Sequence, residues 1–170
     1  MMKTTAAVVT EIGKPLTLLE LDLEDPRDDE ILVRIVATGI CHTDLVVQAG
    51  MLPAPIPVVL GHEGAGIVEK VGSGISKVKQ GDHVVLSFNS CGSCKSCDEK
   101  EPAYCYEFMP YNFGSTREDG TTALSLQNSP VHSNFFGQSS FATFAICREV
   151  NAVKVNKRID ISLLGPLGCG

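Results

Sequence analysis

Four cysteines fall close together in a part of the chain that otherwise lacks the periodicity of a helix or a strand. They are Cys91, Cys94, Cys97 and Cys105, spaced C-x2-C-x2-C-x7-C. The surrounding stretch, residues 90–133, is rich in Ser, Asn, Gly and Pro, and a loop of this length inside a domain needs something to organise it. Four thiolates at this spacing suit a tetrahedral zinc ion with Zn–S bonds of about 2.3 Å and no open position. The spacing therefore predicts a structural zinc site that organises a loop lobe over about residues 90–106.

An iron–sulfur cluster is the first alternative for these cysteines. Bacterial ferredoxin motifs place the fourth cysteine after three residues and follow it with proline. In this chain seven residues intervene, and Tyr106 follows Cys105. Zinc is therefore favoured over an iron–sulfur cluster, and both are favoured over four unrelated surface thiols.

The rest of the chain predicts a mainly β fold with short helices. A short helix is expected from Thr43 to Ala49, where Gly50 ends it, and Pro53, Pro55 and Pro57 indicate an extended loop. Runs rich in apolar and β-branched residues predict strands at 16–23, 31–36, 67–71, 83–86, 141–146 and 152–155. Many short strands with few helices are typical of a small barrel-like β domain.

Charge and hydropathy exclude several classes of function. The chain has 20 acidic and 14 basic residues and a formal net charge of -6, so it offers no basic surface for nucleic acid or an anionic membrane. No apolar run approaches the roughly 18 residues that span a bilayer, and the N-terminus lacks a signal-peptide core. We therefore expect a cytoplasmic protein with a small-molecule partner. Thiols stay reduced in that compartment, so the seven cysteines favour metal binding over disulfides.

A second group of potential metal ligands is scattered along the chain. Cys41 follows a predicted strand, His62 and Glu63 follow the proline-rich loop, and Cys169 lies near the last residue. Two cysteines and one histidine could hold zinc with a fourth position open for water or substrate, as catalytic zinc sites do. Spacing alone does not favour this over a structural histidine and small buried thiols.

Three features in the same order resemble the zinc-containing alcohol dehydrogenases. The segment 61–66, Gly-His-Glu-Gly-Ala-Gly, is followed by Gly72 and Ile75, and the segment 39–44 reads Gly-Ile-Cys-His-Thr-Asp. The four-cysteine lobe is the third feature. The tracts 119–125 and 134–143 resemble the aryl- or benzyl-alcohol dehydrogenase branch. The resemblance covers nearly the whole chain.

This resemblance implies that residues 1–170 form a GroES-like β-barrel catalytic domain that binds two zinc ions. The catalytic zinc would be held by Cys41, His62 and Cys169, with Glu63 beside it as an occasional or indirect ligand. The structural zinc would take the four clustered cysteines. Only Cys147 is then spare, and we expect it in the core of its strand.

The resemblance also implies roles for the residues that follow Cys41. The Thr43 hydroxyl would hydrogen-bond the alcohol oxygen, although a threonine here could equally cap a helix. Asp44 would orient His62, and such partners typically change metal affinity or activity about 10–100-fold when lost. His42 would contact the cofactor pyrophosphate. Val46 occupies a position where many members place a histidine of the proton relay, and valine carries no proton.

The implied reaction is oxidation of a primary, aromatic alcohol to its aldehyde. Zinc in an open site acts as a Lewis acid, and hydride must pass to a nicotinamide, NAD or NADP, since no side chain accepts it. Phe135 and Phe136, with Phe88, are expected in the substrate pocket, where aromatic rings would pack against an aromatic alcohol. A plain core pair explains the two adjacent phenylalanines equally well.

The sequence contains no Gly-x-Gly-x-x-Gly within a βαβ pattern. We therefore expect that the nucleotide-binding domain is absent from this chain, that the 170-residue chain alone is inactive, and that the intact enzyme is a homo-oligomer. Two alternatives remain open: a glutathione-dependent formaldehyde dehydrogenase, which shares Cys-His-Thr-Asp, and a zinc-binding module without catalysis.

Overall fold

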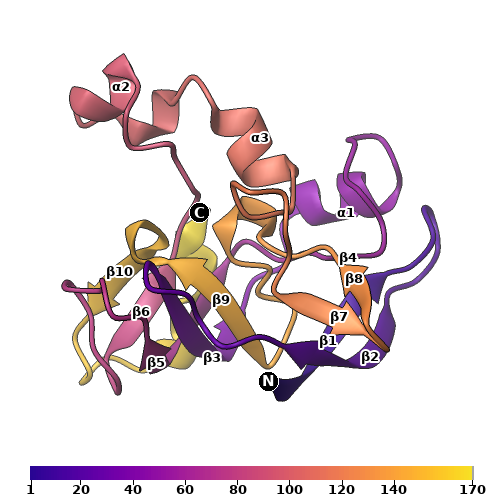
Figure 1. The fold of residues 1–170 in the computed structure, drawn as a ribbon, viewed down its shortest axis with the longest axis horizontal. Coiled ribbons are helices and arrows are strands. Elements are labelled where there is room, and N and C mark those ends of the chain that lie inside the picture. Colours follow the sequence, from indigo (N-terminus) through magenta and orange to yellow (C-terminus); the bar gives the residue numbers. More distant parts are fainter. Residues whose placement is uncertain (170) are drawn as a thin grey trace.

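The computed structural model describes residues 1–169, whose strands form two antiparallel five-stranded sheets (Figure 1). The first sheet has the order β4 (Val58–Val59), β1 (Met2–Val9), β2 (Thr17–Leu23), β7 (Leu124–Leu126) and β8 (Ser129–Val131). The second has the order β10 (Ala152–Val155), β6 (His83–Leu86), β5 (Gly64–Val71), β3 (Glu30–Thr38) and β9 (Phe144–Arg148). The predicted mainly β fold is confirmed.

The segment before β9 joins the two sheets into a partly closed barrel. The Ala7 N–H donates to the carbonyl of Phe141 at 2.8 Å, and the Thr143 N–H donates to Thr5 at 2.9 Å. The Ile35 N–H on β3 donates in turn to Thr143 at 3.0 Å. The strand predicted at 141–146 therefore begins as a bridge between sheets and becomes a regular strand only from Phe144.

Strand β3 is buried on both faces, which explains its run of β-branched residues. Leu32 packs in the core between the two sheets, whereas Ile31 and Val33 point into a second core on the opposite face. Cys147 lies in that second core and is fully buried, as expected for the spare cysteine. Burial raises the pKa of its thiol far above the ordinary value, so it stays a neutral, apolar group.

The helices are short, as predicted. They are α1 (His42–Gln48), α2 (Lys95–Asp98) and α3 (Phe108–Phe113), with single 3-10 turns η1 (Pro102–Tyr104), η2 (Phe135–Gly137), η3 (Glu149–Asn151), η4 (Ile161–Leu163) and η5 (Gly165–Gly168). None of the helices in residues 1–169 is long and apolar enough to cross a membrane. The lobe that carries α2 projects from the sheets, and α3 connects it back to them (Figure 1).

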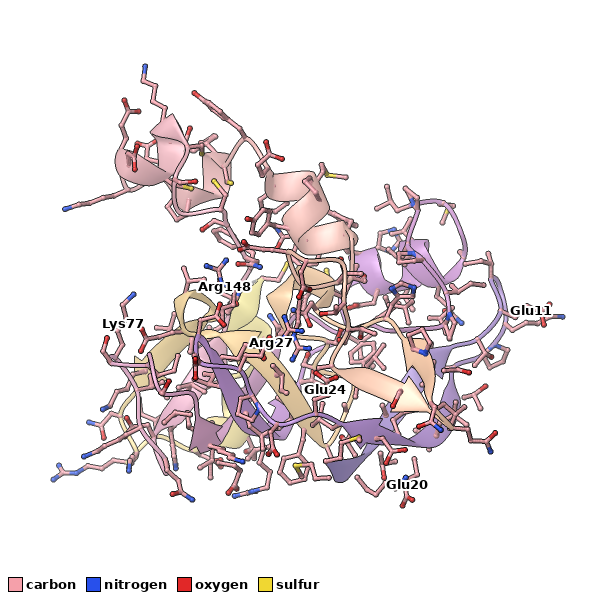
Figure 2. The ribbon with its side chains drawn as sticks, in the orientation of Figure 1. Glu11, Glu20, Glu24, Arg27, Lys77 and Arg148 are labelled. Atoms are coloured by element: carbon pink, nitrogen blue, oxygen red, sulfur yellow. The ribbon has the colours of Figure 1, made fainter. Side chains whose placement is uncertain are left out.

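A buried ion pair fixes the chain after α3 to the barrel. The Arg117 guanidinium donates from Nε to Glu30 Oε1 at 2.6 Å and from Nη1 to Glu24 Oε2 at 2.6 Å. Figure 2 labels Glu24 in the part of the molecule that lies below α3 in this view. The region expected to be irregular, 90–133, thus ends in an ordered β7–β8 hairpin that sequence periodicity missed, since three-residue strands carry almost no pattern.

Candidate active site

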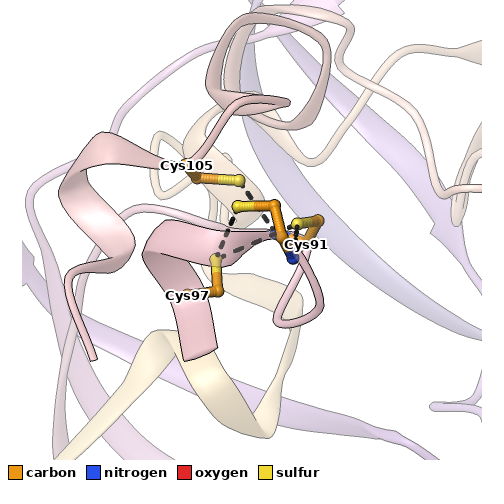
Figure 3. Close-up of side chains that lie close together, drawn as sticks. Cys91, Cys97 and Cys105 are labelled. Carbon is orange, nitrogen blue, oxygen red and sulfur yellow. Dashed lines mark hydrogen bonds between the residues drawn. The ribbon is translucent and has the colours of Figure 1, made fainter. Parts of the chain in front are cut away.

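The four clustered cysteines meet at one point, as predicted. One sulfur atom from each of Cys91, Cys94, Cys97 and Cys105 lies within 4.8 Å of the others. The Sγ–Sγ distance is 3.9 Å between Cys91 and Cys97 and 3.6 Å between Cys94 and Cys97 (Figure 3). A tetrahedral zinc ion with Zn–S bonds of about 2.3 Å requires sulfurs about 3.8 Å apart. The donor set therefore fits a structural zinc ion.

Hydrogen bonds within the lobe favour the thiolate form of Cys91. The backbone N–H of Cys94 donates to Cys91 Sγ at 3.3 Å, and the N–H of Cys91 donates to Cys105 Sγ at 3.3 Å. A backbone hydrogen bond from Ser93 is the main cause that lowers the pKa of Cys91 to about 6. Burial and the neighbouring thiols raise the pKa of Cys97 to about 11. A divalent cation at the centre would keep all four deprotonated.

The second group of ligands also meets, although its members come from three distant segments. Cys41 lies directly before α1, His62 and Glu63 directly before β5, and Cys169 directly after η5. Their ligand atoms lie within 4.8 Å of one another, and the Sγ atoms of Cys41 and Cys169 are 3.8 Å apart. The sequence suggested this set only through the family resemblance, and the fold brings it together.

The turn η5 places Cys169 by packing against the His62 segment. A Cβ atom on Gly168 would lie 2.6 Å from the Leu86 carbonyl oxygen and 3.0 Å from that of His62. Only glycine permits this close approach of the two backbones. The Gly39 N–H also donates to the Glu63 carbonyl at 3.0 Å, so both cysteine-bearing segments are fixed to the same strand end.

Asp44 contacts the ring of His62, the residue that the resemblance implied it would orient. Its carboxylate is buried and accepts three hydrogen bonds: from the Cys41 N–H at 3.1 Å, the Gly61 N–H at 3.0 Å and His62 Nδ1 at 3.2 Å. With Nδ1–H directed to a carboxylate, Nε2 faces the sulfur of Cys41 as a free ligand atom. Burial opposes the charged imidazole, but Asp44 and Cys41 outweigh it and raise the pKa of His62.

Glu63 reaches the same cluster because Gly39, which lies next to it in space, has no side chain. A Cβ atom on Gly39 would lie 1.7 Å from Glu63 Oε2. The Glu63 side chain therefore occupies space that any other residue at position 39 would fill. One carboxylate oxygen lies within 4.8 Å of the ligand atoms of Cys41, His62 and Cys169, beside the cluster that these three residues form.

Thr43 lies beside the cluster, in the first turn of α1. Cys41 is the N-cap, so the alternative of Thr43 as the helix cap is wrong. The Thr43 Oγ1 is 3.6 Å from Cys41 Sγ. Burial opposes ionisation of this thiol, but hydrogen bonds with Thr43, His62 and Cys169 outweigh it and lower the pKa of Cys41. His42 is exposed at the start of α1, and Val46 is half-buried one turn later.

Aromatic rings form one wall of this site. The Phe136 ring stacks on the His62 imidazole with centroids 4.6 Å apart and planes at 27°, and Phe135 approaches its edge at 5.8 Å. Phe88 contacts Phe108, which contacts Phe136 in turn. Phe113 contacts both Phe135 and Phe136. Sequence reasoning missed the two phenylalanines of α3, which only the fold brings to this wall.

Gln138 is a further residue that sequence reasoning missed. Its side chain is fully buried and bridges two backbone groups of the His62 segment. Nε2 donates to the His62 carbonyl at 2.9 Å, and Oε1 accepts from the Gly64 N–H at 2.9 Å. The one available signal was its position within the tract 134–143 that carries the finer resemblance.

A cavity of about 330 Å³ lies elsewhere, beneath α3, and is lined by Arg27, Arg117, Arg148 and several carboxylates. Each of these arginines is paired with a carboxylate within the described residues. None of the eight clustered ligand residues lines this cavity. The chemistry of the chain is therefore assigned to the two ligand clusters.

Comparison with known proteins agrees with this geometry. The family model described as the alcohol dehydrogenase GroES-like domain matches residues 27–157. Geraniol dehydrogenase of Castellaniella defragrans is 51% identical over 166 residues, which is 97% of this chain and 44% of that protein. S-(hydroxymethyl)glutathione dehydrogenase of Escherichia coli is 37% identical over 171 residues, 99% of this chain and 46% of that protein.

Among solved structures, benzyl alcohol dehydrogenase from Acinetobacter calcoaceticus superimposes with a TM-score of 0.95 at 48% identity. The match covers 100% of this chain and 46% of that one. The chain thus spans less than half the length of each of these three proteins.

Proposed function

Because the chain belongs to the alcohol dehydrogenase GroES-like domain family, we propose that it is the catalytic domain of a zinc-dependent alcohol dehydrogenase. The observation that carries the proposal is the second ligand cluster, where Cys41, His62 and Cys169 converge with Glu63. Two thiols and one imidazole leave a tetrahedral zinc ion one further position, which suits a catalytic site. A zinc-binding module without catalysis would not explain why these ligands converge at a second, open site.

The roles of the residues follow from their contacts. Cys41, His62 and Cys169 would hold the zinc, which as a Lewis acid would polarise the oxygen of a bound alcohol. Asp44 keeps His62 in the tautomer that leaves Nε2 free for the metal. The Thr43 hydroxyl, 3.6 Å from Cys41 Sγ, would hydrogen-bond the alcohol oxygen, and it would accept the alcohol proton only while passing its own proton on through the cofactor ribose and water.

We propose a hydrophobic, aromatic primary alcohol as the substrate. Phe135, Phe136 and Phe88 belong to the aromatic wall beside His62, and flat rings pack well against such a wall. The names of two similar proteins refer to geraniol and to benzyl alcohol. Both alcohols are therefore tested first.

The cofactor in this proposal is NAD or NADP, bound chiefly by a nucleotide domain outside residues 1–170. His42, exposed at the start of α1, is the residue of this chain proposed to contact the cofactor pyrophosphate. Hydride transfer requires the nicotinamide close to the substrate carbon. The 170-residue chain by itself is therefore expected to show no turnover, and the intact enzyme is proposed to be a homo-oligomer.

Metal analysis and steady-state kinetics test the proposal. The purified intact enzyme is expected to contain two zinc ions per chain, and its Cys41→Ser variant is expected to contain one and to lose activity. Cys147→Ala is the matched control, because Cys147 is a buried core thiol outside both clusters, and it should retain both ions.

The intact enzyme is then assayed with benzyl alcohol, geraniol and S-(hydroxymethyl)glutathione. Preference for benzyl alcohol supports the proposal. Preference for geraniol would support a hydrophobic primary alcohol but refute the aromatic part, and preference for the glutathione adduct supports the formaldehyde dehydrogenase alternative. The proposal is refuted if the protein contains one zinc ion per chain, Cys41→Ser does not change that content, and no alcohol is oxidised. The protein would then be a zinc-binding module without catalysis.

A further inference from the structure

The hydrogen bond that His62 Nδ1 donates to Asp44 fixes one atom of the imidazole ring but not the tilt of its plane. A ring held only at Nδ1 can still rock about that contact, which would move Nε2 away from the other ligand atoms. Phe136 lies flat against the imidazole, with the ring centroids 4.6 Å apart and the planes at 27°. Phe135 contacts the same imidazole nearly edge-on, at 73°. A face-on and an edge-on contact together remove the remaining freedom of tilt.

The backbone at Phe136 is held in a conformation that a bulky residue rarely adopts. Its φ is 49° and its ψ 36°, in the left-handed region. Such strained residues persist only where the surroundings determine them, and they gather at functional sites. The Gly137 N–H donates to the Asn134 carbonyl at 2.7 Å, and the Ser139 hydroxyl donates to the Val59 carbonyl at 2.6 Å. These hydrogen bonds hold the turn that carries Phe136.

Helix α3 supports the Phe136 ring from other directions. Phe113 contacts it edge-on at 5.1 Å and 66°, and Phe108 at 6.1 Å and 80°. The helix is anchored by the fully buried Asn112, whose side chain accepts from the Asn89 N–H at 2.8 Å and donates to the Asn89 carbonyl at 2.9 Å.

The same helix is continuous with the four-cysteine lobe. Asn89, which anchors it, lies just before Cys91, and the Phe108 N–H donates to the Cys105 carbonyl at 3.1 Å. Both ends of the lobe are therefore connected to the helix that supports Phe136.

We propose that Phe136 is a positioning residue that fixes the plane of the His62 imidazole, and that α3 connects this function to the four-cysteine lobe. The inference rests on the proposed function, since it concerns the metal that Cys41, His62 and Cys169 would hold. In this arrangement the helix that follows the lobe supports the ring that lies against His62.

Cobalt titration of the intact protein tests this proposal without any alcohol. Co²⁺ is added to metal-free protein, the second metal equivalent is assigned by its loss in Cys41→Ser, and its affinity is measured by competition with a chelator. Its visible absorption bands report the ligand geometry. Phe136→Leu keeps an apolar side chain but removes the flat ring. It is expected to weaken the second equivalent about tenfold or more and to shift its bands. Phe113→Leu should act in the same direction more weakly.

Phe144→Leu is the matched control, because Phe144 packs against the core between the two sheets. It should lower stability without changing the second metal equivalent. The inference is overturned if Phe136→Leu binds the second cobalt with parental affinity and bands, or if Phe144→Leu changes them equally. If the parent protein binds only one equivalent, the proposed function fails and this inference with it. If the parent binds two and oxidises alcohols while Phe136→Leu matches it, only this inference fails.

Discussion

Replacing Asp44 with asparagine tests how the second metal site is held together. The substitution preserves the size of the side chain but removes its charge and turns one acceptor into a donor. In the structure Asp44 Oδ1 accepts from Gly61 and His62, and Oδ2 accepts from the Cys41 N–H. An asparagine that keeps its oxygen at the Oδ1 position directs its NH₂ group at the Cys41 N–H, where two donors then face each other.

The magnitude follows from the lost bonds. A buried N–H left without an acceptor costs about 1–3 kcal/mol, and hydrogen bonds to a charged group are worth about 1.5–3 kcal/mol each. We therefore expect Asp44→Asn to lower the free energy of unfolding by about 2–3 kcal/mol. Weaker orientation of His62 should also reduce affinity for the second metal ion about 10–100-fold.

In the metal-free protein, the loss of stability caused by Asp44→Asn should depend on pH. Because Asp44 raises the pKa of His62 in the folded state, the pair contributes stability below the ordinary histidine pKa of about 6.5, and this is lost as pH rises through the folded pKa. The gap in stability between parent and Asp44→Asn should therefore be larger at pH 5.5 than at pH 8.5.

Urea unfolding and chelator competition measure the two effects. Asp29→Asn serves as the control, because the carboxylate of Asp29 is exposed and its contact with Arg148 Nε is 3.8 Å long. If Asp44→Asn has the same urea midpoint and the same metal affinity as Asp29→Asn, the role assigned to Asp44 is refuted.

Three further substitutions probe separate parts of the structure. Gly39→Ala should displace Glu63, cost about 1–3 kcal/mol by overpacking and weaken the second metal ion; parental metal affinity would contradict the placement of that carboxylate. Asp82→Asn should lose about 1 kcal/mol at pH 7 by urea unfolding. Its hydrogen bond with Lys154 lowers the pKa of Asp82, so the difference should begin to shrink as pH falls below about 4 and should be lost as pH falls through the lower pKa of the folded state. Cys97→Ser should remove one zinc equivalent in elemental analysis and loosen the lobe; unchanged zinc would refute the structural site.

The four-cysteine site could be predicted from the sequence because all its ligands come from one short segment. Spacing that is local in the chain translates directly into proximity, and the structure confirms that the four sulfurs converge. The mainly β character could be predicted for the same reason, since strands such as β3 and β5 are long enough to show their apolar pattern. The hairpin of β7 and β8 was missed because each strand has only three residues.

The second site is different, because Cys41 and Cys169 are brought together across most of the chain. No local sequence pattern shows that residues so far apart in the chain meet, and only the resemblance to a known family suggested that Cys41, His62 and Cys169 bind one metal ion. Even less in the sequence indicated the residues that support His62. Gln138 is important because its amide meets the backbone of His62 and Gly64, and Phe136 because its ring meets the imidazole. Sequence determined which groups could bind metal, whereas tertiary packing decided which of them meet and how each is held, since those contacts join strands and turns that are far apart in the chain.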